Sequence, residues 1–84
     1  MYKKYQAEEH NVDRLKTLGK VLREHRELSF LSRDYIDKEY SISKSLIERA
    51  EKGANITLMT LFRLCDIYDI PLYELMNEVE CENL

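Results

Sequence analysis

The sequence predicts an all-α fold, a compact bundle of five short helices. Apolar residues recur at intervals of three and four along most of the chain, which is the spacing of one face of a helix. The 84 residues include only two glycines and one proline, so the chain has few places to turn, which favours helices joined by short connections. The length allows one small domain, and we find no strand, repeat or low-complexity linker.

The first helix is predicted over residues 12–26. Its apolar face consists of Val12, Leu15, Leu18, Val21 and Leu22. A glycine inside a helix costs about 1 kcal/mol relative to alanine, so Gly19 indicates that another helix approaches closely there. Residues 1–11, "MYKKYQAEEHN", precede the apolar face and form an N-terminal arm.

The second helix is predicted at about residues 33–39. Ser29 and Ser32 both suit the position that caps a helix start. A helix that begins after them directs Ile36 and Tyr40 towards the core.

The third helix is predicted at about residues 44–52. Ser43 can cap it through its side-chain oxygen, and Ser45 with Glu48 is a second possible capping pair. Gly53 ends the helix as the residue that takes a positive φ.

Two further helices complete the bundle. Thr57 caps the fourth helix, and Pro71 opens the last, which runs to about Val79 before a frayed acidic tail at residues 80–84. The apolar positions of the fourth helix are Leu58, Leu61, Leu64, Cys65 and Tyr68.

Charge is unevenly distributed along the chain. The net charge is +2 over residues 1–27, zero over 28–56 and −5 over 57–84, a total of −3. An overall negative charge is unusual for a protein that binds nucleic acid, although a small basic patch can bind when the acidic residues lie on the far side.

Other sequence features narrow the class of protein. No apolar run approaches the roughly 18 residues that span a bilayer, and the first residues lack the apolar core of a secretory signal. Cys65 and Cys81 are the only cysteines, which favours a reducing cytoplasm, with Cys65 buried and Cys81 exposed. His10 and His25 have no metal-ligand spacing, and no phosphate-binding loop or catalytic grouping is present. We therefore expect no enzyme, no metal and no cofactor.

Residues 18–76 resemble the five-helix DNA-binding domain of phage repressor and Cro proteins, the lambda repressor-like or XRE family. Four pieces carry the resemblance in order, "LREHRE", the stretch "SISKSLIERAEKG", "NITLMTL" and "YDIPLYELM". The connection of about three residues between the second and third helices is that of a helix-turn-helix. The resemblance implies that the third helix is a recognition helix, which enters the major groove of double-stranded DNA.

The resemblance assigns roles to individual residues. Lys44, Ser45 and Arg49 become the candidates for base contact, since lysine and arginine suit the acceptor pair of guanine. Ser43 and Lys52 fit contacts with the DNA backbone. Arg33, at the start of the second helix, matches a family position that touches phosphate or a neighbouring base. Leu46 is half-exposed in this interpretation, and Arg26 and Glu51 match a partly buried ion pair of the family.

Two positions depart from the family pattern. Asp37 stands where alanine is usual, so its carboxylate must lean to solvent, pair with a base such as Lys44, or accept hydrogen bonds from the start of the third helix. Ser41 stands where glycine is usual, and a positive φ there costs serine on the order of 1 kcal/mol.

The main functional hypothesis is a DNA-binding transcriptional regulator, a repressor that binds a palindromic operator as a homodimer. The residues expected on its dimer surface are Leu72, Tyr73, Met76 and Val79. The alternative is a protein-interaction module on the same fold, an antitoxin or an inhibitor of another regulator, which the net negative charge and Asp37 favour. The N-terminal arm remains open between disorder, DNA contact, an extension of the first helix and cover for a dimer partner.

Overall fold

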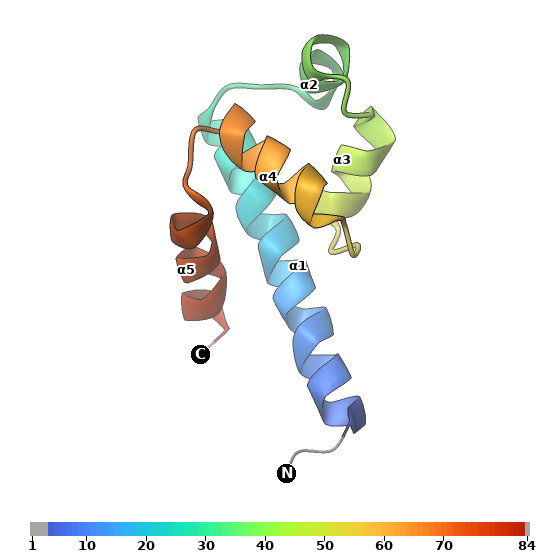
Figure 1. Cartoon of the computed structure of the whole chain (residues 1–84), viewed down its shortest axis with the longest axis vertical. Helices are drawn as coiled ribbons and strands as arrows, with labels where there is room; N and C mark the ends of the chain where they lie inside the picture. Colours follow the sequence, from blue (N-terminus) through green and yellow to red (C-terminus); the bar gives the residue numbers. More distant parts are fainter. Residues whose placement is uncertain (1–3, 84) are drawn as a thin grey trace.

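Five helices make up the described part of the chain, residues 4–83 of this computed structural model (Figure 1). No strand occurs within those residues, so the all-α class is confirmed. The helices are α1 (Lys4–Leu28), α2 (Arg33–Tyr40), α3 (Lys44–Glu51), α4 (Leu58–Ile67) and α5 (Leu72–Glu82).

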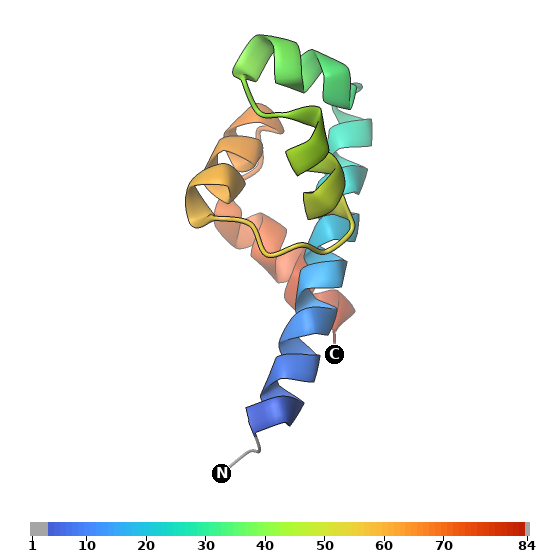
Figure 2. The same ribbon diagram turned by 90° about the vertical axis from the view of Figure 1, so that its right-hand side faces the viewer.

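The long helix α1 organises the bundle. Helices α3 and α5 both pack against it, α2 packs on α3, and α4 packs on α5. In Figure 1, α3 and α5 lie on opposite sides of α1, and Figure 2 shows α3 in front of α1 with α5 behind it. The N-terminal end of α1 projects beyond the other helices, and the molecule has extents of 46 × 22 × 18 Å.

The core takes side chains from all five helices. Because each apolar stripe faces the same centre, every helix contributes at least one fully buried residue. The largest of these are Leu22, Ile36, Ile42, Ile47, Leu64 and Leu75, with Ile42 supplied by the connection between α2 and α3.

Helices α1 and α3 meet at Gly19. A Cβ atom at this position would lie 2.5 Å from the carbonyl oxygen of Ala50, which is backbone and cannot rotate away. The close helix neighbour predicted from the glycine is therefore confirmed, and it fixes how near α3 lies to α1.

Side-chain oxygens cap three of the helices. Ser32, Ser43 and Thr57 each accept a hydrogen bond from the backbone N–H three residues later, so they begin α2, α3 and α4. Four helices are also followed by a residue at positive φ, and only one of these is a glycine. They are Phe30 after α1, Ser41 after α2, Gly53 after α3 and Asp69 after α4.

Two helices extend further than the apolar pattern predicted. Helix α1 begins at Lys4 instead of residue 12, so most of the expected arm is helical, and residues 1–3 of it lie outside the described part. Residues 4–11 carry no apolar face, but lysine, glutamine, alanine and glutamate favour the helix that continues from the packed part. Helix α5 continues to Glu82, so residues 80–82 are helical and not frayed.

Three apolar residues are more exposed than expected. Val12, Tyr40 and Leu58 were expected on inward faces, and they are 48%, 41% and 66% exposed. Each lies towards the end of its packed segment, where no other helix covers it. The ring of Tyr40 packs edge-on against Tyr35 at the surface of α2, with 6.4 Å between centroids.

Among residues 4–83, no helix combines the length and apolar character that crossing a bilayer requires.

Candidate functional site

Helix α3 has a buried inner face and an exposed outer face. Ile47 and Ala50 are buried, and the partly buried Leu46 packs against the core. Since the helix turns about 100° per residue, the polar positions between them point outward. The exposed side chains of α3 and its end, here called the α3 outer face, are Lys44, Ser45, Arg49 and Lys52.

Two side chains cap the start of α3. The hydroxyl oxygen of Ser43 accepts from the N–H of Leu46 at 3.1 Å, and the Oδ2 atom of Asp37 accepts from the N–H of Lys44 at 2.9 Å. Of the three environments considered for Asp37, the structure therefore contains the one at the helix start. A carboxylate there is stabilised by the positive end of the helix dipole.

The turn between α2 and α3 is held at both of its sides. Ser41 has φ 58° and ψ 36°, the left-handed conformation expected at this position, and its N–H donates to the carbonyl oxygen of Asp37 at 3.0 Å. The next residue, Ile42, is buried in the core. The turn is thus anchored by one hydrogen bond and one apolar side chain, which fixes the direction in which α3 leaves α2.

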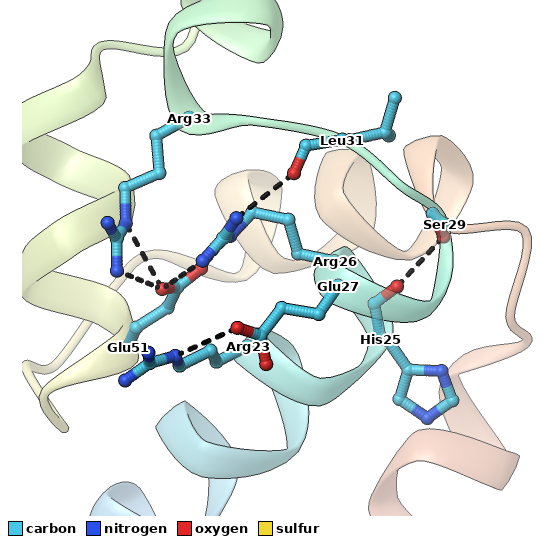
Figure 3. Close-up of polar contacts among 8 residues, drawn as sticks. All are labelled: Arg23, His25, Arg26, Glu27, Ser29, Leu31, Arg33 and Glu51. Atoms are coloured by element: carbon cyan, nitrogen blue, oxygen red, sulfur yellow. Dashed lines mark hydrogen bonds and ion pairs between the residues drawn. The ribbon is translucent and has the colours of Figure 1, made fainter.

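A buried carboxylate anchors the end of α3 (Figure 3). Glu51 accepts from the Nε atom of Arg26 at 2.7 Å and from the Nη2 atom of Arg33 at 2.9 Å. Arg26 also donates to the carbonyl oxygen of Leu31 at 3.0 Å. The side chain of Glu51 is 4% exposed and that of Arg26 9%, whereas Arg33 is 30% exposed.

The expected ion pair of Arg26 and Glu51 is therefore present, and Arg33 joins it. The hydrogen bonds that Arg26 donates to Glu51 raise the pKa of Arg26, which keeps the guanidinium charged despite its burial. Two cations share one carboxylate, so the junction of α1, α2 and α3 keeps an excess of one positive charge.

Tyr68 borders this junction from α4. Burial raises the pKa of its phenol far above the ordinary 10.0, and the nearby charge of Glu51 raises it further. Its hydroxyl has no hydrogen-bond partner among the described residues. The phenol is consequently neutral at any physiological pH.

The cations of the α3 outer face are largely unpaired within residues 4–83. Lys44 Nζ lies 3.4 Å from Asp34 Oδ1, a contact between two exposed side chains that contributes little. Arg49 and Lys52 form no ion pair in this part of the chain. The face therefore offers three cationic side chains and one hydroxyl to a ligand, with the partly buried Glu48 on the same side of the helix.

Acidic side chains of α5 face α1 instead. Glu80 pairs with Arg14, Glu82 with Lys20 at 3.0 Å, and Glu78 with His25 at 2.7 Å. These contacts lie on the side of α1 opposite α3 (Figure 1). Much of the negative charge of the last third of the chain is thus held away from the α3 outer face.

The four residues expected on a dimer surface differ in how far they are exposed. Val79 is 2% exposed and belongs to the core, so its assignment to that surface was wrong. It was misplaced because the apolar pattern of a short helix does not show which residues its neighbours cover. Leu72 and Met76 are partly buried against the core, and only Tyr73 is widely exposed, at 73%.

Sequence reasoning missed two features of the structure. The contact of Arg33 with Glu51 joins residues 18 positions apart and leaves no periodic signal. The second is an exposed apolar group on α4 formed by Leu58, Met59 and Phe62. Its signal was visible as an apolar spacing of three and four, from Met59 and Leu58 to Phe62, although only Met59 and Phe62 lie outside the main stripe.

The chain matches no family model, no curated protein and no solved structure.

Proposed function

We propose that the protein is a sequence-specific regulator of transcription that binds double-stranded DNA, with α2 and α3 as its helix-turn-helix. In this proposal it is a repressor that binds a palindromic operator as a homodimer, in the cytoplasm and without catalysis. One observation carries the proposal. Lys44, Ser45 and Arg49 project together from the outer face of a helix whose inner face and end are fixed in the bundle.

Geometry supports this use of α2 and α3. Residues 41–43 join the two helices, which pack against each other, and a connection of this length is typical of the helix-turn-helix. In that arrangement the start of the second helix enters the major groove. Lys44 and Ser45 occupy the first turn of α3, and Arg49 lies one turn beyond Ser45 on the same side of the helix.

The proposed base contacts follow from side-chain chemistry. Arg49 presents the fork of donors that matches the two acceptors of guanine, and Lys44 offers a single cation to the same edge. Ser45 donates or accepts with either base of a pair. Lys44 gives up only an exposed contact with Asp34, so the protein loses little when it turns to DNA.

The proposed backbone contacts surround these residues. Ser43 and Lys52 stand at the two ends of α3, where a hydroxyl donor and a point charge suit phosphate oxygens. Arg33 is 30% exposed at the start of α2 and is held in place by Glu51. Its pairing orients the guanidinium in advance, and the excess positive charge of the junction favours a phosphate beside it.

The experiment is an anisotropy titration of labelled genomic duplex fragments at low and at moderate salt. The wild type is expected to bind with an affinity that falls steeply with salt, because bound phosphates release counterions. A Lys44→Glu/Arg49→Glu variant is expected to lose this binding while its helical circular dichroism is retained.

A matched control is available on the opposite side of α1. The variant Arg14→Glu/Lys20→Glu changes the net charge by the same amount, but at residues that face α5. It is expected to keep most of the binding. Absence of wild-type binding at low salt, at concentrations where the protein is dimeric, would exclude the regulator.

A second candidate function is a protein-interaction module such as an antitoxin or an inhibitor of another regulator. It is favoured by Leu28 at the end of α1 and Phe30 in the turn that follows, which are 72% and 95% exposed. Exposed apolar groups of this kind mark protein contacts. If a Phe30→Ser/Leu28→Ser variant retains salt-dependent DNA binding, these two residues are not needed for the DNA contact proposed for the α3 outer face.

A further inference from the structure

We propose that the exposed face of α4 is the surface through which two copies of this chain associate. This inference rests on the proposed function for the need to present two α3 helices to one operator. The α4 face is defined here as Leu58, Met59, Phe62, Arg63 and Asp66, all of which are exposed. It replaces α5 as the candidate for the dimer surface.

The apolar part of the α4 face is large for so small a domain. Leu58, Met59 and Phe62 are 66%, 68% and 45% exposed, and residues three and four apart on a helix are neighbours. They therefore form one continuous patch. By contrast, α5 has buried Val79 and partly buried Leu72 and Met76 in its own core, so it offers a partner little more than Tyr73.

The α4 face is complementary to itself. Beside the apolar patch lies a hollow of about 270 Å³, lined by Tyr40, Arg63, Asp66 and Ile67. Two of the lining residues are joined to each other, since Arg63 donates to the carbonyl oxygen of Tyr40. The face thus carries an exposed methionine and borders a recess that α4 forms together with Tyr40 of α2.

A two-fold axis at Phe62 brings these two features together. Met59 precedes Phe62 by three residues, and the α4 residues that line the hollow follow Phe62 by one to five residues. When two α4 helices pack antiparallel about Phe62, Met59 of each copy faces the hollow of the other. A contact of this kind is isologous and closes after two copies.

Charge favours a second copy as the occupant. The two charged residues of the face, Arg63 and Asp66, have opposite signs and sum to zero. Two identical faces therefore meet without net repulsion, which an acidic or a basic face would not allow. Methionine and phenylalanine are also the residue types enriched at the centres of protein interfaces.

The position of α4 suits the proposed function. Residues 52–57 connect α3 directly to α4 (Figure 2). An axis through α4 would thus fix the separation of two α3 helices, and a dimer of this kind reads half-sites roughly 34 Å apart.

The experiment compares charge substitutions on α4 and α5 by light scattering after size exclusion. The wild type is expected to have the mass of a dimer, Phe62→Glu the mass of a monomer, and Tyr73→Glu the mass of a dimer. Retained helical circular dichroism shows that each variant is folded. A monomeric wild type, a dimer that survives Phe62→Glu, or a dimer that is also lost in Tyr73→Glu would overturn the assignment.

A cross-linking experiment tests the position of the axis. In a Cys81→Ser background, Phe62→Cys is expected to form a disulfide with its own copy under mild oxidation, because the two side chains meet at the axis. Tyr73→Cys in the same background is the exposed control and is expected to stay uncross-linked. Equal cross-linking of both variants would count against an axis at Phe62.

The two hypotheses fail in different ways. Neither mass nor cross-linking depends on DNA, so a dimer that binds no duplex would remove the proposed function and leave this surface standing. Salt-dependent duplex binding by a protein that stays monomeric would do the reverse.

Discussion

Glu51 joins three helices through one buried carboxylate. It belongs to α3 and accepts from Arg26 of α1 and Arg33 of α2. Removing such groups from water costs much of what their attraction returns, so the net gain in stability from the pair is small. The geometric consequence is larger, because the contact sets the position of the end of α3 relative to both neighbours.

We expect Glu51→Ala to destabilise the fold by about 3–5 kcal/mol, since it leaves the buried guanidinium of Arg26 without its counter-charge. The exposed pair of Arg23 and Glu27, 3.5 Å apart, supplies the control. Glu27→Ala is expected to cost about 0.3–0.5 kcal/mol. Urea unfolding of both variants measures the difference in stability. Equal losses of stability would show that a buried ion pair matters no more here than an exposed one.

Tyr68, beside the same junction, makes the stability of the fold depend on pH. Its folded-state pKa lies above the ordinary 10.0, because burial disfavours the phenolate. A group whose pKa is raised on folding contributes its full stability below the unfolded pKa, and that stability falls as pH rises past it. The wild type is therefore expected to lose stability above about pH 10.

We expect Tyr68→Phe to reduce this loss of stability at alkaline pH. At neutral pH the variant is expected to be as stable as the wild type or slightly more stable, because the hydroxyl has no partner among residues 4–83. Tyr73→Phe, at an exposed position, is the control and should leave the pH profile unchanged. The measurement is thermal unfolding across an alkaline pH series, and identical profiles for all three proteins would contradict the assignment.

The crossing of α1 and α3 depends on the absence of a side chain. Gly19 lets the two backbones approach until a Cβ atom would lie 2.5 Å from the carbonyl oxygen of Ala50. Intrinsic helix preference alone would favour alanine at this position by about 1 kcal/mol. The free energy of packing favours glycine instead and is the larger of the two, since the backbone oxygen of Ala50 can move away only if α3 shifts as a whole.

We expect Gly19→Ala to destabilise the fold by about 1–3 kcal/mol, because it overpacks the contact between the helices. His10→Ala, at an exposed position on the same helix, is expected to stay within about 0.5 kcal/mol of the wild type. Chemical denaturation compares the two. A Gly19→Ala protein more stable than the wild type would show that α1 and α3 separate without cost.

Charge is separated across the whole molecule. On one side of α1, acids of α5 pair with Arg14, Lys20 and His25, and on the other side α3 presents its cations to solvent. A net charge of −3 is therefore compatible with a local cationic face. Under the proposed function the acidic side would repel DNA and so select the side of the protein that docks.

We expect the triple variant Glu78→Gln/Glu80→Gln/Glu82→Gln to bind duplex DNA modestly more tightly at low salt. Three lost negative charges take the net charge from −3 to zero, which removes a long-range repulsion. The salt dependence is expected to stay the same, because it counts the phosphates contacted and these lie at α3. Anisotropy titrations at several salt concentrations test this, and a changed slope would place acids of α5 at the DNA contact.

Local sequence signals were sufficient to predict the helices at the centre of the chain. The bounds of α2 and α3 differ from the predicted ones by one residue, since caps such as Ser43 and stops such as Gly53 act on the nearest backbone groups. The left-handed conformation of Ser41 was expected from the family resemblance, and the structure contains it.

Gly19 and the family resemblance indicated two contacts between α1 and α3, but other contacts between distant segments were beyond the sequence pattern. Whether Arg33 stands free or pairs with Glu51 depends on how α2 and α3 pack, and no spacing encodes it. The same holds for the exposure of Leu58 and the burial of Val79, because a helical stripe tells which residues share a face but not which of them a neighbour covers. Three-dimensional packing makes that choice, since burial depends on the position of the other helices. For the same reason it moved the candidate dimer surface from α5 to α4.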